Sequence, residues 1–161
     1  MARAEKGVLT QGTHVWVFDQ LGTPALHRIF CLKSIDVGDD SVSDVDDACL
    51  DSDVLTTDWG AITPGEGSLV INTDPENESH LTLLEIASRR GAVDVYIGWS
   101  DGVGEPTLVD GAVDLPPTRT WSYFEAKIRK GKPVFDPNSI VNHTLPMKRR
   151  TEVIEEFRPK N

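Results

Sequence analysis

Residues 67–99 read GSLVINTDPENESHLTLLEIASRRGAVDVYIGW and predict a strand, a helix and a second strand in succession. The first seven and the last seven of these residues have the apolar and β-branched content of buried strands. Between them, Asp74 is a natural N-cap, Pro75 suits the first helical position, and Gly91 suits the residue after the last turn. We therefore expect a helix over about residues 75–90 that packs one broad apolar face on a sheet.

Further strands are expected on both sides of this unit. They lie at residues 12–18, 26–35, 108–115 and 120–129, with a last strand region in 140–157, chiefly 151–157. Residues 130–138, KGKPVFDPN, are expected to form a linker because they contain two prolines. The predicted fold class is α+β, mainly β, with two packed antiparallel β-sheets, sandwich- or barrel-like, flanked by one α-helix. A chain of 161 residues is most simply a single domain, 1–161, with a C-terminal arm at about 136–161.

Residues 36–58 contain nine aspartates and no lysine or arginine. The aspartates are Asp36, Asp39, Asp40, Asp44, Asp46, Asp47, Asp51, Asp53 and Asp58. The apolar residues among them keep neither the period of a strand nor that of a helix, so we predict a long acidic loop that allows one short strand near 37–42. Loops of this length are uncommon in compact domains and are often functional.

Charge is distributed unevenly along the chain, whose formal net charge is −10. Residues 34–88 contain fourteen Asp or Glu and no Lys or Arg, whereas residues 119–161 contain ten Lys or Arg against five Asp or Glu. The acidic segment of one copy can therefore attract the basic end of another, and the alternative is that both are solvated faces. The candidate basic counterparts are Lys127, Arg129, Lys130, Lys132, Lys148, Arg149 and Arg150.

No motif indicates a catalytic, cofactor or metal site. Residues 44–55 have acids at several EF-hand positions, but Cys49 stands where glycine must turn and Leu55 where glutamate is required. Motifs of serine hydrolases, zinc proteases and dinucleotide-binding folds are missing. Cys31 and Cys49 are expected to be a reduced intracellular pair. The sequence thus predicts a protein that is not an enzyme, and its lack of a long apolar run predicts no membrane span.

The order of segments resembles that of the major tail tube proteins of long-tailed, non-contractile bacteriophages of the lambda type. The segments that carry the resemblance are GTHVWVF (12–18), IDVGDDSVSDVDDACLD (35–51), the capped helix ending in RRG, YIGWSDG (96–102) and TRTWSYFEAKIRKGKP (118–133). The resemblance covers roughly residues 7–135 and is weakest at the C-terminal LPMKRRTEVIEEF.

This resemblance implies a structural virion protein that self-assembles into hexameric rings, stacked as the phage tail tube that conducts DNA during ejection. Its partners would be copies of itself, the tape-measure protein, the tail terminator and distal tail proteins, with assembly in the host bacterial cytoplasm. It also implies that residues 36–58 contact a neighbouring subunit or ring. DNA would pass without specific binding, because affinity for phosphates requires clustered cations and this chain is acidic.

Two alternatives remain open at this point. One is a related ring protein of the same architecture: a tail terminator, a baseplate hub or a secretion tube protein. The other is a monomeric acidic module that binds cations or a basic partner. Electron microscopy separates the three, because tubes, single rings and monomers differ in appearance.

Overall fold

The computed structural model describes residues 7–160, which contain thirteen strands and one helix. The main sheet contains β1 (His14–Asp19), β2 (Ala25–Ile29), β3 (Leu32–Asp36), β6 (Glu66–Asn72), β7 (Ala92–Gly98), β10 (Trp121–Ile128), β11 (Pro133–Val134), β12 (Asn142–Arg149) and β13 (Ile154–Glu156). Two separate hairpins pair β4 (Ser41–Asp46) with β5 (Thr57–Thr63) and β8 (Thr107–Val109) with β9 (Ala112–Asp114), and the helix is α1 (Glu78–Arg89). The predicted class, α+β and mainly β, is confirmed.

The main sheet is antiparallel and has the order β2-β1-β7-β10-β12-β6-β3, with β11 added to β12 and β13 added to β10. Its end strands, β2 and β3, are joined by only Phe30 and Cys31, and Cys31 has a left-handed φ of 57°. The sheet must therefore bend until its two ends lie close together. The expected pair of packed sheets is one continuous, curved, sandwich-like sheet, and within residues 7–160 it does not close into a barrel.

One hydrophobic core lies between the curved sheet and α1. Strand residues contribute to it at intervals of two, as expected when one face of each strand is buried. The core residues are Val15, Val17, Ile29, Leu69, Ile71, Val93, Val95, Ile97, Phe124, Ala126, Ile128, Leu145 and Met147 from the strands, and Leu83, Ile86 and Ala87 from the helix. Burial of this apolar surface is the main favourable term that holds the fold together.

The helix begins three residues later than the predicted residue 75. Asn77 is the N-cap, and its side chain accepts a hydrogen bond from the N–H two residues on, at 3.1 Å. Asp74 instead closes a turn before the helix. Both are N-cap residue types, and with the observed start His80 buries its ring and hydrogen-bonds the Phe30 carbonyl at 2.8 Å. At the other end, Arg90 takes the left-handed position that was predicted for Gly91.

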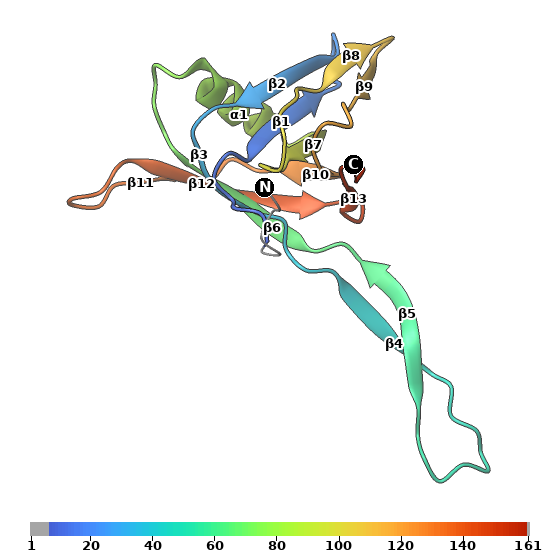
Figure 1. Cartoon of the computed structure of the whole chain (residues 1–161). Helices are drawn as coiled ribbons and strands as arrows, with labels where there is room; N and C mark the ends of the chain where they lie inside the picture. The colour runs from blue at the N-terminus through green and yellow to red at the C-terminus, as the bar shows by residue number, and fades with distance from the viewer. Residues whose placement is uncertain (1–6, 161) are drawn as a thin grey trace.

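Residues 36–58 are not a long loop, so that prediction was wrong. β4 and β5 form an antiparallel hairpin, which reduces the loop to residues 47–56, and this hairpin projects far from the body of the molecule (Figure 1). Val42 pairs with Ile62, which lies beyond the acidic segment. The pattern was hidden because a hairpin with both faces in solvent needs no alternation of apolar and polar residues. We call β4, β5 and residues 47–56 the acidic hairpin.

Four other segments also differ from the expectation. Residues 26–35 form two strands, and residues 108–115 contain a hairpin whose turn places Asp110 and Gly111 at φ of 52° and 77°. The predicted linker contains β11, and the predicted C-terminal arm contains β12, a core strand. Its neighbour β13 is only three residues long, although 151–157 was the expected strand. Pro146 interrupts the pattern that would have identified β12, because proline is unusual inside a sheet.

A second buried cluster surrounds Arg119 on the other side of the sheet. The Arg119 guanidinium carbon lies 5.8 Å from the Trp16 ring centre and 5.4 Å from that of Trp121. Its nitrogens donate to the carbonyls of Gly98 (2.7 Å), Trp99 (2.8 Å), Gly104 (3.2 Å) and Gly12 (3.3 Å). Burial lowers the pKa of Arg119, and these carbonyls replace the water that its charge has lost. The cluster joins the N-terminal segment to the ends of β7 and β10.

Candidate functional site: an acidic hairpin and a basic cleft

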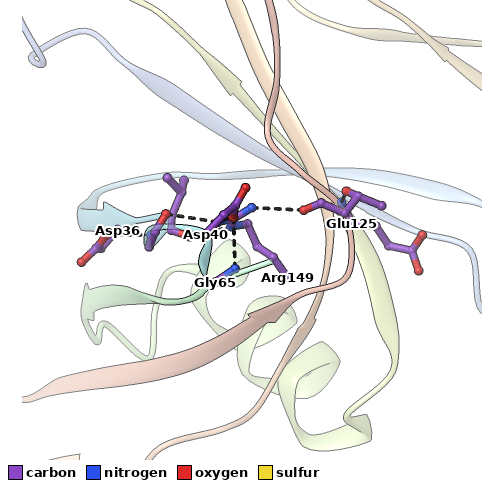
Figure 2. Close-up of polar contacts among 8 residues, drawn as sticks. Asp36, Asp40, Gly65, Glu125 and Arg149 are labelled. Atoms are coloured by element: carbon purple, nitrogen blue, oxygen red, sulfur yellow. Dashed lines mark hydrogen bonds and ion pairs between the residues drawn. The ribbon is translucent and has the colours of Figure 1, made fainter. Parts of the chain in front are cut away.

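Arg149, in β12, holds the base of the acidic hairpin (Figure 2). Its side chain is only 1% exposed and forms an ion pair with Asp40. It also donates to the carbonyls of Val37 at 2.7 Å, Gly38 at 3.1 Å and Thr151 at 3.1 Å. A buried guanidinium whose three nitrogens all donate hydrogen bonds fixes the chain at this point. The acidic hairpin therefore leaves the body from a rigid base.

Asp40 connects the two strands at this base. Besides the ion pair, its carboxylate accepts a hydrogen bond from the Gly65 N–H at 3.1 Å, and the Arg149 guanidinium lowers the pKa of Asp40. The backbone N–H of Arg149 in turn donates to the Gly65 carbonyl at 3.2 Å. A side chain at Gly65 would place its Cβ 2.1 Å from the Asp39 carbonyl oxygen, so glycine is required at this close approach of the two segments.

The structure divides the nine aspartates by their hydrogen bonds. Asp36, Asp40, Asp46, Asp47 and Asp58 each accept at least one from the described chain. Among residues 7–160, no donor reaches the carboxylates of Asp39, Asp44, Asp51 and Asp53, all of which are exposed. These four are free to meet groups outside the chain.

The acidic hairpin also exposes apolar side chains. They are Val45, Leu50, Val54, Leu55, Trp59 and Ile62. Trp59 is 77% exposed, whereas Trp16 and Trp121 are buried. Scattered exposed apolar residues are normal, but a group of them on one projecting element is typical of a contact surface.

The candidate basic residues also divide into two groups. Lys148 pairs with Glu66 at 3.5 Å and Arg150 with Glu125 at 3.7 Å, while Arg149 is buried against Asp40. Within residues 7–160, the other four candidates form no ion pair with an acidic side chain: Lys127, Arg129, Lys130 and Lys132. All four are exposed.

These four cations lie around two adjoining depressions at the C-terminal end of α1. One, of about 540 Å³, is lined by Ala87, Ser88, Arg90, Arg129, Lys130, Gly131, Lys132, Pro133 and His143. The other, of about 250 Å³, is lined by Glu66, Gly67, Arg90, Lys127, Ile128, Arg129, Pro146, Met147 and Lys148. Arg90 lines both, and the sequence indicated only its favourable place near the end of a helix. The left-handed φ of Arg90, 56°, is uncommon outside glycine and is visible only in the folded chain. The sequence therefore held no signal that placed Arg90 in this site. We call Arg90, Lys127, Arg129, Lys130 and Lys132 the basic cleft.

The buried histidines, His80 and His143, are held by hydrogen bonds within the fold. His143 forms a 2.5 Å hydrogen bond with the Thr73 hydroxyl, and burial lowers the pKa of His143.

In residues 7–160, His, Cys, Asp and Glu side chains do not gather in groups of three that could hold a metal ion. The described part of the chain likewise has no helix of the length and apolarity that a membrane span requires.

The chain is similar to known proteins over nearly its whole length. Residues 6–159 match the family model described as phage tail tube, TTP, lambda-like. Structural protein 3 of Pseudomonas phage PAJU2 is 29% identical over 143 residues, which cover 86% of this chain and 87% of that protein. The resemblance proposed from the sequence is thereby confirmed.

Solved structures show the same fold at low sequence identity. The tail tube of phage SPP1 has a TM-score of 0.64 at 6% identity and covers 96% of this chain and 81% of that one. The sheath/tube terminator of the extracellular contractile injection system PVC also has a TM-score of 0.64, at 14% identity, and covers 96% and 99%. With the match over residues 6–159, these findings show that the chain belongs to the lambda-like phage tail tube family, whose members are structural proteins of the virion.

Proposed function

We propose that copies of this chain assemble into hexameric rings and that the rings stack into the tail tube through which phage DNA is ejected. The observation that carries the proposal is the presence, on one chain, of a projecting acidic hairpin and a separate cleft of cations that form no ion pair within residues 7–160. Two different, complementary surfaces produce head-to-tail contacts, which close into rings or continue as filaments. Family membership and the fold shared with the SPP1 tail tube support the same assembly.

In this proposal the acidic hairpin is the contact to a neighbouring subunit or ring. The ion pair of Arg149 with Asp40 presents the hairpin in one direction, so less conformational freedom is lost on binding. Asp39, Asp44, Asp51 and Asp53 have carboxylates available for the cations of a neighbour. Trp59 adds an exposed aromatic ring, the residue class that most often contributes strongly to interfaces.

The charge of the chain suits a channel for DNA. A net charge of −10 on each subunit works against the accumulation of phosphate contacts, so DNA passes without specific binding. The further partners that we propose are the tape-measure protein inside the tube and the terminator and distal tail proteins at its ends. Assembly would take place in the cytoplasm of the host bacterium, and the chain would act as one domain without enzymatic activity.

Electron microscopy of the purified protein over a range of concentrations tests the proposal. Hollow tubes of uniform diameter, with six-fold symmetric end views, are the expected result. Single closed rings would favour a terminator-like role, which the fold shared with the PVC sheath/tube terminator makes the second candidate. A monomer at every concentration would contradict both and favour an acidic binding module.

A further inference from the structure

The β11–β12 hairpin is a second arm, and it leaves the body on a different side from the acidic hairpin (Figure 1). Pro133 pairs with His143 and Val134 with Asn142, which defines the start of the arm. The turn beyond them contains Asn138 at a left-handed φ of 60°. Two prolines, at positions 133 and 137, limit the conformations of this segment. We call residues 133–143 the second arm.

The second arm exposes three large apolar side chains around its turn. Val134 is 41% exposed, Phe135 73% and Ile140 65%. An aromatic ring and two β-branched side chains that stay in solvent do not stabilise an isolated monomer. Because the element is short and held by a β-ladder, these side chains are displayed in advance for a partner, which limits the entropy lost on contact.

The foot of the second arm is part of the basic cleft. Arg129, Lys130 and Lys132 immediately precede β11, and Pro133 and His143 line the same depression as these cations. The cations and the apolar side chains therefore form one continuous surface, with positive charge at the foot and apolar groups toward the turn. A partner for it must offer carboxylates and apolar side chains together.

The end of the acidic hairpin has this combination. Residues 47–56 carry Asp47, Asp51 and Asp53 together with the exposed side chains of Leu50, Val54 and Leu55. We propose that the second arm of one subunit is the docking surface for the end of the acidic hairpin of a second copy. Carboxylates contact the basic cleft, and the apolar side chains cover Phe135 and Ile140. This inference rests on the proposed function, because it names the partner surface of the same assembly.

Within residues 7–160, the acidic hairpin and the second arm of the same chain do not contact each other (Figure 1). Arg149 and Asp40 hold the acidic hairpin at its base, and the two arms project in different directions (Figure 1). The pairing is therefore between copies and joins two unlike surfaces, as a ring or a tube requires. An interface with an apolar part also persists at salt concentrations that screen exposed ion pairs.

The first test removes the apolar side chains of the second arm. The variant Phe135→Ser/Ile140→Ser is compared with Leu108→Ser/Val109→Ser, which changes side chains that are 41% and 53% exposed on the β8–β9 hairpin. All these residues are exposed, so thermal unfolding of both monomers should match that of the wild type. The arm variant should raise the protein concentration needed for tubes by about tenfold or more. The control should form tubes at the wild-type concentration.

The second test is disulfide trapping. The native Cys49 in the end of the acidic hairpin is combined with Ser139→Cys in the turn of the second arm, in a Cys31→Ser background. Mild oxidation of assembled protein should link the subunits, whereas Thr107→Cys on β8 should give no link to Cys49. A second-arm variant that forms tubes at the wild-type concentration, or equal linking to both positions, would overturn this inference alone. A wild type that forms no tubes would overturn the proposed function as well.

Discussion

Asp40 and Arg149 are 109 positions apart in the chain and form an ion pair at the base of the acidic hairpin. Arg149 belongs to β12, a strand of the main sheet, and Asp40 immediately precedes β4. The contact joins the acidic hairpin to the body. Because Arg149 is buried in this ion pair, it is not available to another subunit. Its neighbours in sequence, Lys148 and Arg150, form exposed ion pairs that contribute little to stability.

Replacing Arg149 with methionine should lower the free energy of unfolding by roughly 3 kcal/mol, because three backbone carbonyls lose the buried guanidinium that donates to them. Urea denaturation measures this change. Arg150→Ala is the control, and loss of its exposed pair with Glu125 should cost about 0–1 kcal/mol. Equal effects of the two substitutions would mean that Arg149 does not anchor the hairpin.

The base of the acidic hairpin should loosen in acid. The pKa of Asp40 lies below the ordinary value of 3.8, chiefly because of its hydrogen bond with Arg149. A lowered pKa in the folded state means that Asp40 contributes stability above the unfolded value and loses it as the pH falls through the folded value. The Gly65 amide, which donates to Asp40, should therefore shift in an NMR titration only below pH 3.8. Asp40→Asn should abolish this shift, and a persistent shift would assign it to another group.

The two tyrosines should ionise only in strongly alkaline solution. Burial, followed by the charge of Asp94 and by Tyr123, raises the pKa of Tyr96 to about 12, and burial also raises the pKa of Tyr123. The native protein should therefore show less tyrosinate absorbance at pH 10.0, the ordinary pKa, than the unfolded chain does. Because the unfolded state releases its protons first, stability should decline as the pH rises above that value. Tyr96→Phe should reduce this decline, and an unchanged decline would contradict the assignment.

Arg119 should not be replaceable by lysine. Its nitrogens reach the carbonyls of four residues, and a single ammonium group cannot bond all of them from a buried position. We expect Arg119→Lys to lower the thermal midpoint by on the order of 5–10 °C, which corresponds to about 2–3 kcal/mol in a chain of this size. Arg158→Lys, at an exposed arginine, is the matched substitution and should leave the midpoint nearly unchanged.

Reversing charges on the acidic hairpin should block assembly without unfolding the monomer. Asp44, Asp46 and Asp47 changed together to lysine place positive charge opposite the cations of a neighbour. Sedimentation and electron microscopy should then detect no tubes, while circular dichroism of the monomer stays the same.

The control for this reversal alters the same number of exposed acids elsewhere, Glu76, Glu85 and Glu152, and so changes the net charge equally. This variant should still form tubes. Tubes from the hairpin variant at the wild-type concentration would show that its charge does not direct the contact.

Strands with one buried face were predictable because the chain itself repeats every two residues. Residues 93–99 and 120–129 alternate in this way, and both occur as β7 and β10. The start of α1 was not predictable, since Asp74 and Asn77 are both suitable caps and the burial of His80 selects the second. The acidic hairpin escaped prediction for a related reason. Its pairing depends on β5, most of which (residues 59–63) lies outside the acidic segment, and no burial imposes a pattern on it.

The class of fold and the separation of acidic and basic charge could be inferred from the sequence, because periodicity and composition are properties of the linear chain. The family was indicated by a resemblance in the order of segments. Which cations are available became clear from the folded chain, because a salt bridge depends on distance in space. The fold buries Arg149 against Asp40 and leaves Arg129, Lys130 and Lys132 unpaired beside Arg90, within the part of the chain that is described. The fold also brings these cations to the foot of the second arm, where a surface for assembly can form.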